Sequence, residues 1–537
     1  MIMKCFLNGI VHTVNPFLPR AEAVVTQGTR IVFVGTSSAA GRFAGAEAEV
    51  IDLQGRLLLP GFIDDHVHFV LGGTQVDGLN LRGCTSTAAF IAGVSAYVRS
   101  HRGTWVIGGD WDQEAWETKT LPRREWIDPV SPDTPLFLPR FDWHMALANT
   151  AALQQAGITR DTPDPPGGRI ERDAATGEPT GIVKDAAMEL VLGVIPKPAS
   201  HDLERAVLKA LEEARRAGVT SVHDIAEEAH IPVYKKLEGE GKLTCRIYAR
   251  LPLAGYQKLM RERARHAHGD DLVKVGSMKA FADGSLGSNT AWFFEPYLNE
   301  PTTGLAMEAL TSGQLRTWAM DADRHGLQLS IHAIGDRAND AVLEIFEEIV
   351  RANPPWDRRF RIEHAQHVRR EDVARFAALG VIVSAQPYHC IDDGVWAETR
   401  IGPERAATTY AFKTFLNAGV KVCFGSDWTV APLNPLLGIH AAVTRATLDG
   451  KRPEGWTPAE RLTVEEAVRC YTINNAYASF EEQLKGSIEA GKLADMVVLS
   501  ENIFALPPEA IKDVRVEMTV VGGACYDVRR SDTSMSG

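Results

Sequence analysis

Cysteine is scarce in this chain, and long hydrophobic runs are missing altogether. Only seven cysteines are scattered over 537 residues, and none form a CxxC pair. This pattern indicates reduced thiols and excludes a disulfide framework. No run of about 18 apolar residues is present that could span a bilayer. The N-terminal segment MIMKCFLNGIVHTVNP mixes polar residues into its apolar run, so it does not look like a secretory signal. We therefore expect a cytoplasmic protein.

Positive charge is also in deficit. The 57 Lys and Arg residues face 69 Asp and Glu residues, which gives a net charge of −12. Nucleic-acid binding depends on clustered cationic residues, so this balance argues against a phosphate-backbone partner. Hydrophobic residues make up 45% of the chain and charged residues 23%, which is typical of a globular protein with a sizeable core.

The two ends of the chain have the same character. Residues 1–59 and 487–537 both consist of short β-branched runs separated by turn signals, such as EAVVTQGTRIVFVGT and LADMVVLS. Such runs predict antiparallel strands. Because neither end is long enough to bury a good core alone, we expect both to share one β-sandwich.

The middle of the chain, residues 60–486, alternates apolar strands with amphipathic helices. Examples are LQLSIHA and VKVCFGSD among the strands, and RANDAVLEIFEEIVRA among the helices. Repeated alternation predicts a parallel sheet covered by helices, and a (β/α)8 barrel is its natural closure. A doubly wound open sheet is the rival. Residues 80–185 break the pattern and are rich in Trp, Pro and Gly, so they are expected to form a mixed α/β insertion in the barrel.

Metal-ligand side chains recur at the ends of the predicted strands. His66 and His68 are two residues apart and therefore share one face of a strand. His332, His364 and Asp427 end three further strands, and His367 is a weaker candidate than His364. Each alone has a structural explanation, but together they would meet at the carboxyl end of a barrel, where such enzymes build their sites. Nitrogen and oxygen ligands of this kind suit a divalent metal.

Several segments in a fixed order carry a family resemblance. The sequence resembles the amidohydrolase superfamily over nearly its whole length, and within it the YtcJ-like branch that includes N-substituted formamide deformylases. The segments that carry this resemblance are LPGFIDDHVHF, DWHMALANTAAL, GVTSVHD, MKAFADGSLGSNTA, IHAIGDRAND, RIEHAQHV, FGSDW and GKLADMVVL.

The resemblance implies a binuclear centre, with zinc as the expected metal. One ion would be held by His66, His68 and Asp427, and the other by His332 and His364. A bridging ligand from the middle strand is then needed, often a lysine carboxylated by CO2. Lys279 and Lys274 are the candidates, and Lys279 is chosen because it lies nearer the carboxyl end of its strand. A mononuclear site with a surface lysine is the alternative.

The predicted reaction is hydrolysis of a C–N amide bond, in an N-substituted formamide or related N-acyl compound, by a metal-activated hydroxide. Asp427 would take a proton from the water and give it to the leaving amine. Arg337 is expected to pair either with a substrate carboxylate or with Asp336. The residues expected to bind substrate are Asp110, Trp111, Arg140, His144, Asp283, Arg337 and Trp428.

Three rival functions are kept. A deaminase on the same scaffold often carries His-x-x-Glu on the fifth strand, but the third residue after His332 is Gly335. Ester or lactone hydrolysis shares the same metal chemistry. A non-catalytic regulatory homologue would have no need of the full ligand set. The expected partner is a small-molecule amide, with no nucleic acid and no membrane, and with a homodimer left open.

Overall fold

Eight parallel strands form the centre of the protein. The computed structural model describes residues 2–262 and 264–528. The strands neighbour one another in sequence order. They are β8 (Phe62–Val67), β14 (Val219–Ile225), β15 (Arg246–Pro252), β17 (Val273–Phe281), β18 (Gln328–Ala333), β19 (Arg361–His364), β20 (Ile382–Ala385) and β21 (Val422–Phe424). A short strand, β16 (His268–Gly269), pairs antiparallel with β17.

Backbone hydrogen bonds join the last strand to the first. The N–H of Asp427 donates to the carbonyl of His66 at 2.7 Å, and the N–H of His68 donates to the carbonyl of Trp428 at 2.9 Å. These bonds close the sheet on itself just beyond the ends of β21 and β8. The predicted (β/α)8 barrel is therefore confirmed, and the open doubly wound sheet is wrong.

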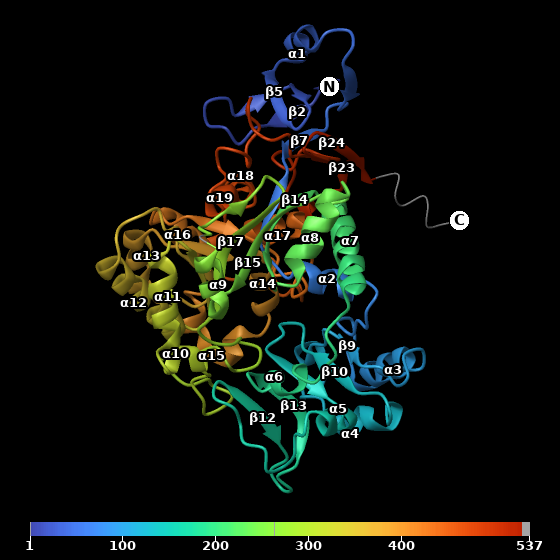
Figure 1. Cartoon of the computed structure of the whole chain (residues 1–537), viewed down its shortest axis with the longest axis vertical. Coiled ribbons are helices and arrows are strands. Elements are labelled where there is room, and N and C mark those ends of the chain that lie inside the picture. Colours follow the sequence, from blue (N-terminus) through green and yellow to red (C-terminus); the bar gives the residue numbers. More distant parts are fainter. Residues whose placement is uncertain (1, 263, 529–537) are drawn as a thin grey trace.

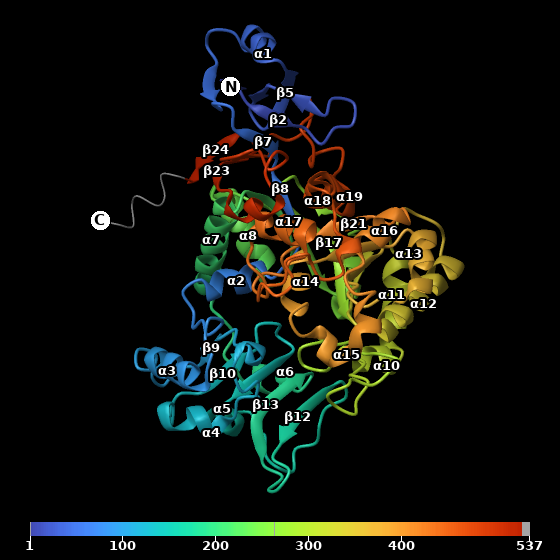
Figure 2. The ribbon, with the colours of Figure 1, turned by 180° about the vertical axis from the view of Figure 1, so that it is seen from behind.

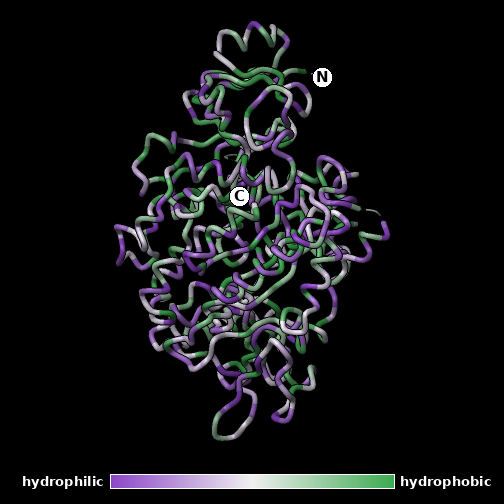
Figure 3. The backbone as a smooth tube through the Cα atoms, turned by 90° about the vertical axis from the view of Figure 1, so that its left-hand side faces the viewer, coloured by the Kyte–Doolittle hydropathy of each residue, from purple (hydrophilic) through white to green (hydrophobic). Residues whose placement is uncertain are grey.

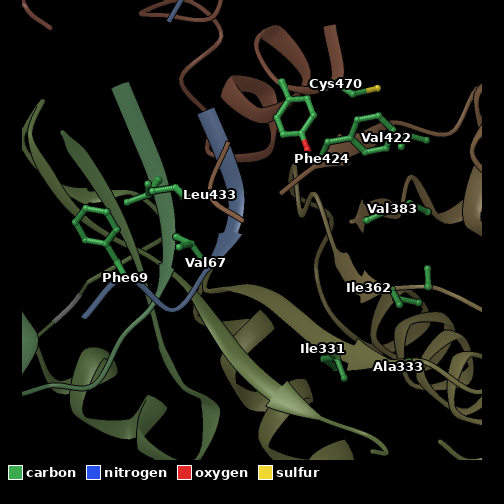
Figure 4. Packing of buried hydrophobic residues seen from close by; sticks show 14 of the residues in the cluster. Val67, Phe69, Ile331, Ala333, Ile362, Val383, Val422, Phe424, Leu433 and Cys470 are labelled. Carbon is green, nitrogen blue, oxygen red and sulfur yellow. The ribbon is translucent and has the colours of Figure 1, made fainter. Parts of the chain in front are cut away.

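Helices cover the outside of the barrel because alternate strand residues are apolar and point outward. Figure 4 shows Ile331, Ile362, Val383 and Val422 at corresponding places on four strands of the barrel. The helix after β18 is amphipathic and buries Val342, with others on the same face, against these residues. The covering helices are α7 (Ser200–Arg216), α8 (His230–Gly239), α9 (Tyr256–Arg261), α11 (Gln314–Arg324), α12 (Asp336–Ala352), α13 (Val373–Leu379), α16 (Phe412–Asn417), α17 (Pro435–Thr444), α18 (Val464–Cys470) and α19 (Ile473–Ala478).

Two sheets built from the chain ends lie at one end of the barrel (Figure 1). The first contains only N-terminal strands, β1 (Met3–Leu7), β4 (Ala23–Gln27), β5 (Arg30–Gly35) and β6 (Glu49–Asp52), with α1 (Ser37–Ala44) against it. The second mixes both ends: β2 (Ile10–His12), β3 (Arg20–Ala21), β7 (Leu57–Pro60), β22 (Met496–Leu499), β23 (Val516–Val521) and β24 (Ala524–Asp527).

The two terminal sheets share one hydrophobic core. Phe6 and Val24 from the first sheet pack with Leu58, Met496 and Val520 from the second. In Figure 3 the strands nearest the N-terminus are strongly hydrophobic. Strand β7 pairs antiparallel with β22, so the two chain ends are joined by backbone hydrogen bonds.

A third unit lies between β8 and β14 in the sequence and at the opposite end of the barrel (Figure 2). Its sheet has the order β12 (Gly168–Arg172), β13 (Pro179–Asp185), β11 (Met145–Ala148), β10 (Leu136–Pro139) and β9 (Val106–Ile107). The helices of this stretch are α2 (Phe69–Gln75), α3 (Thr87–Val98), α4 (Arg124–Ile127), α5 (Thr150–Gln155) and α6 (Met188–Leu192). We call residues 80–185 the inserted segment.

The remaining elements are short. Three of them, α10 (Glu308–Thr311), α14 (Pro387–Asp393) and α15 (Ala397–Ala406), follow barrel strands on the side of the inserted segment (Figure 2). Six are 3-10 turns: η1 (Gln113–Ala115), η2 (Asp128–Val130), η3 (Leu253–Gly255), η4 (Arg370–Asp372), η5 (Pro458–Glu460) and η6 (Pro508–Asp513). None of the helices in the described ranges combines the length and the apolar character needed to cross a membrane.

Candidate metal centre

Three potential ligands meet at the carboxyl end of the barrel. His66 lies on β8, His364 ends β19, and Asp427 follows β21. One ligand atom from each lies within 4.8 Å of the others, and all three residues are buried. His364 and Asp427 both have a positive φ, 72° and 56°. Such strained backbone in a non-glycine residue persists where the surrounding structure enforces it, often at a functional site.

The electrostatics of Asp427 fit a bound cation. Burial alone would raise the pKa of this carboxyl, but His66, His68 and His364 hold it well below its ordinary value. Its Oδ1 atom is buried and takes part in no hydrogen bond among the described residues. Nε2 of His68 lies 3.3 Å from that oxygen, and Nε2 of His66 lies 3.5 Å away. A buried ionised oxygen ringed by imidazole nitrogens is the donor set that a divalent cation prefers.

His332 lies beside this cluster. Its ring centroid is 4.5 Å from that of His364. Its Nε2 faces the carbonyl oxygen of Gly284 at 3.1 Å, so Nδ1 is the nitrogen left for a metal. Burial lowers the pKa of His332 and of His364 well below the ordinary value, which favours the neutral ring that metal coordination requires.

Lys279 and Lys274 occupy opposite ends of β17. Lys279 is buried, and its Nζ has no hydrogen-bond partner in the described structure. Burial lowers the pKa of Lys279 to about 7, against the effect of Glu363 nearby. Lys274 instead pairs with Glu481 at 2.5 Å, in a cluster with Lys485. Lys274 is therefore engaged in an ion pair of its own, and Lys279 is the lysine that lies near the ligands.

A buried ion network beneath the ligands was missed by the sequence reasoning. Glu363 accepts a hydrogen bond from Nδ1 of His66, which fixes the ring and leaves Nε2 toward Asp427. The same carboxylate pairs with Arg250 at 2.7 Å and with Arg361 at 3.1 Å. The arginines hold the pKa of Glu363 well below its ordinary value, although burial acts in the opposite direction. Asp65 and His223 complete the network around Arg361.

The sequence did contain a signal for this network. In the strand RIEH, Arg361 and Glu363 alternate with an apolar residue, which turns both of them to the inside of the barrel. Charged residues at interior positions of a buried strand require partners on neighbouring strands. Their spacing alone could not name those partners.

A narrow pocket opens over the ligands. Its volume is about 40 Å3, room for a few water molecules. One wall comes from the barrel and the other from the inserted segment, and many of its side chains are polar. The lining residues are Arg140, Phe141, Asp142, His144, Ser285, Leu286, Gly287, His332, Ile334, His364, Gln366, His389, Asp392, Asp393, Trp396, Asp427 and Val430.

Two of the predicted substrate-binding residues, Arg140 and His144, line this pocket. Arg140 is nonetheless fully engaged, because it pairs with Asp112 at 3.0 Å and with Asp142 at 2.6 Å. His144 faces the pocket with its Nδ1 bonded to Asp185 at 2.6 Å. Burial would lower the pKa of His144, but Asp185 and Asp142 raise it above the ordinary value.

Asp110 and Trp111 lie away from the pocket, contrary to expectation. Trp111 is fully buried in the core of the inserted segment, and its indole N–H donates to the carbonyl of Leu138 at 2.7 Å. Asp110 is buried against Gln75. The aromatic residues of this segment build its own core, because a sheet of short strands needs large side chains to exclude water.

Arg337, Trp428 and Asp283 are also outside the pocket lining. The Arg337 guanidinium is exposed and stacks over the ring of Trp292 at 4.3 Å, and it forms no ion pair with Asp336 among the described residues. Trp428 packs against Phe69 and helps to close the barrel through its backbone. Asp283 is buried and accepts backbone hydrogen bonds from Ile334 at 3.0 Å, Gly335 at 2.8 Å and Trp292 at 2.8 Å, so it holds loops in place.

The segment after β20 supplies pocket residues that the sequence reasoning did not select. Gln386 accepts a hydrogen bond from Nδ1 of His364 at 2.7 Å and so orients that ring. His389, Asp392 and Asp393 follow on α14 and line the pocket. The polar run QPYHCIDD directly after a buried strand was the available signal.

Comparison with known proteins gives a consistent result. A model of the amidohydrolase family matches residues 49–526. The chain is 37% identical over 534 residues to "Protein LONG AFTER FAR-RED 3" of Arabidopsis thaliana, covering 96% of this chain and 90% of that protein. It is 32% identical to "Putative amidohydrolase YtcJ" of Bacillus subtilis and 30% identical to "N-substituted formamide deformylase" of Arthrobacter pascens, covering 96% of this chain and 97% of each of them.

A solved structure agrees in fold. An uncharacterized metal-dependent hydrolase from Pyrococcus furiosus superposes with a TM-score of 0.73 at 30% sequence identity, covering 94% of this chain and all of that chain. The expected resemblance, including that to the YtcJ-like branch, is thereby confirmed.

Proposed function

The chain belongs to the amidohydrolase family, and on that premise we propose that it is a metal-dependent hydrolase that cleaves the C–N bond of an N-substituted formamide or related amide. One observation carries the proposal. His66, His364 and Asp427 bring their ligand atoms within 4.8 Å of one another beside the pocket, and Oδ1 of Asp427 has no other hydrogen-bond partner in the described chain.

A divalent cation, for which we propose zinc, fits this set of ligands. His66, His364 and Asp427 would hold it, with His68 beside them and His332 available for a second ion. When bound, such an ion lowers the pKa of water and polarises a carbonyl group. We propose that Lys279 is carboxylated and would then serve as a ligand shared by the two ions, since its Nζ lacks a partner among the described residues and a pKa of about 7 leaves an uncharged amine available to CO2.

Residues around the ligands orient the histidine rings and transfer a proton. Glu363 and Gln386 fix the His66 and His364 rings through Nδ1. Asp427 would hold a proton on the carboxylate oxygen that does not bind the cation and pass it to the nitrogen of the departing amine. The network of Arg250 and Arg361 keeps Glu363 ionised beneath them.

The pocket favours a small acyl group. Its volume of about 40 Å3 matches a formyl group better than a bulky acyl chain. The relative from Arthrobacter pascens is named for N-substituted formamides. A deaminase is less well supported. That chemistry needs an acidic side chain three residues after His332, and this position is Gly335, whose backbone N–H donates to Asp283. Ester or lactone hydrolysis would use the same residues, so only a test of substrates distinguishes it from amide hydrolysis.

A substrate panel with a matched inactive variant tests the proposal. Zinc-loaded protein is offered N-alkylformamides, the corresponding N-acetyl compounds, esters and lactones of equal size, and amine release is measured together with metal content. We expect formamides to be cleaved best and Asp427→Asn to be inactive with its metal retained. Stable protein that takes up no zinc in this loading and cleaves none of the substrates would instead favour the regulatory homologue.

A further inference from the structure

The inserted segment carries a histidine–carboxylate pair into the pocket. His144 directly precedes β11, and Asp185 ends β13. Met145 pairs with Lys184 in the antiparallel ladder, and the N–H of Asp185 donates to the carbonyl of His144 at 3.1 Å. The register of the inserted sheet therefore sets these two residues side by side. Their side chains are joined by the 2.6 Å bond between Nδ1 and Oδ1.

This bond decides which ring nitrogen faces the pocket. A carboxylate accepts, so Nδ1 of His144 carries the donated hydrogen and Nε2 is the nitrogen left over. The side chain of Asp185 is completely buried, whereas that of His144 is 15% exposed and lines the pocket. Its ring centroid lies 5.2 Å from that of His332. The polar atom that the inserted segment offers beside the candidate metal ligands is therefore Nε2.

The backbone around the pair is strained. Trp143 and Asp185 have φ values of 58° and 45°, in the left-handed region that non-glycine residues avoid. Each such conformation costs ~1–3 kcal/mol and persists where other contacts enforce it. One such contact comes from the barrel. Asp142, which precedes Trp143, accepts a hydrogen bond from the hydroxyl of Ser285 at 2.6 Å.

The pair is also fitted closely to the barrel loop that holds His332. A Cβ added to Gly284 would lie 2.8 Å from Oδ1 of Asp185 and 2.0 Å from Oγ1 of Thr290. The carbonyl of the same glycine accepts the hydrogen bond from Nε2 of His332. The inserted segment and the barrel thus meet at a fixed geometry, in which His144 and His332 lie on adjacent walls.

Two other polar side chains of the pocket, Arg140 and Gln366, are already engaged, whereas Nε2 of His389 has no hydrogen-bond partner among the described residues. Arg140 is bound to Asp112, Asp142 and Gln113, and Gln366 donates to Asp393. From this geometry, and resting on the amide hydrolysis proposed above, we propose that His144 is a catalytic residue of the reaction. Its Nε2, the lone-pair nitrogen of the neutral ring, accepts a hydrogen bond from the N–H of the scissile amide, and Asp185 is the residue that positions it. No bond forms or breaks at the imidazole in this role.

Two substitutions at one position separate contact with the substrate from support of the fold. Asn at residue 144 can keep a donor near Nδ1 and so the bond to Asp185, but it places nothing at Nε2. Gln is longer and brings its amide oxygen, an acceptor, toward the Nε2 position. His144→Asn, His144→Gln and Asp185→Asn are compared with His101→Asn, which changes an exposed histidine of the same segment outside the pocket lining. The assays are kcat and KM on an N-alkylformamide, zinc content and the melting temperature.

We expect His144→Asn to lower kcat by ~10²–10³, the effect of removing one preorganised hydrogen bond to the reacting amide. His144→Gln should recover at least about tenfold of that loss, and His101→Asn should match wild type. Zinc content should stay unchanged in all four variants.

Loss of zinc in His144→Asn would overturn the inference, because His144 would then act through His332. Unchanged kcat in that variant would overturn it while leaving the amide hydrolysis standing. A wild-type protein that binds zinc but cleaves no amide would remove the proposed function itself, and the role of His144 with it.

Discussion

Replacing Glu363 by Gln should weaken metal binding and the barrel together. Glu363 is completely buried and is surrounded only by donors: Nδ1 of His66, the guanidinium groups of Arg250 and Arg361, and the hydroxyls of Ser330 and Ser384. A glutamine amide keeps one oxygen acceptor, but its NH2 group must point at donors. Whichever way the amide turns, buried donors lose their partner.

The magnitude follows from the partners that remain. Arg361 keeps its pair with Asp65 at 2.8 Å, whereas Arg250 makes no other ion pair in the described ranges. Breaking a buried pair from one side costs ~3–5 kcal/mol. The loss of the carboxylate that orients His66 should weaken metal affinity by ~10–100-fold.

Competition with a chelator measures the zinc affinity, and the melting temperature measures the stability of the fold. The matched control is Glu481→Gln, which removes another buried carboxylate from its pairs with Lys274 at 2.5 Å and Lys485 at 2.7 Å. The control should lose stability and keep its zinc affinity. The reasoning is refuted if Glu363→Gln binds zinc as tightly as wild type, or if the control loses as much affinity.

Four further outcomes are expected. Asp427→Asn should keep most of its metal while turnover falls by ~10²–10⁴, because the proton carrier is lost; elemental analysis and kcat on one preparation check this, and lost metal would contradict it. In wild type, 13C-bicarbonate should give a carbamate NMR signal that Lys279→Ala lacks, and this variant should lose its second ion first. In metal-free protein the folded-state pKa of Lys279, about 7, lies below its ordinary value of 10.5. Between these values the unfolded state binds the extra proton, so stability rises with pH. Lys279→Met should abolish this rise in melting temperature, and an unchanged rise would show that the pKa of Lys279 is not lowered by folding. Truncation after residue 486 removes β22, the partner of β7, and should cause aggregation through an exposed strand edge; a soluble and fully active truncation would contradict this.

Local patterning determined much of the fold. Strands such as LQLSIHA and helices such as RANDAVLEIFEEIVRA carry their periods in the sequence, because a side chain's exposure repeats with the geometry of its own element. The barrel could be inferred from their alternation. The placement of His66, His332, His364 and Asp427 near one another followed, since the carboxyl ends of parallel strands meet at one face of a barrel.

The contacts between elements were beyond the reach of local patterning. Nothing in the spacing of Trp111 or Arg337 separates a pocket wall from a core residue or a surface stack, because that difference depends on what another segment places opposite. The role of Glu363 could not be inferred from local patterning either. Its carboxylate can bond to the His66 ring only because β8 and β19 face each other across the barrel interior.

The inserted segment shows most clearly what the sequence determined and what only the tertiary structure decided. Its sequence determined that Trp- and Pro-rich residues would form a separate unit, and it made His144 a candidate. Only the tertiary structure decided that His144 meets Asp185 and faces the pocket beside His332. The register of a sheet and the docking of one unit on another are set by long-range packing, and long-range packing depends on all the partners at once.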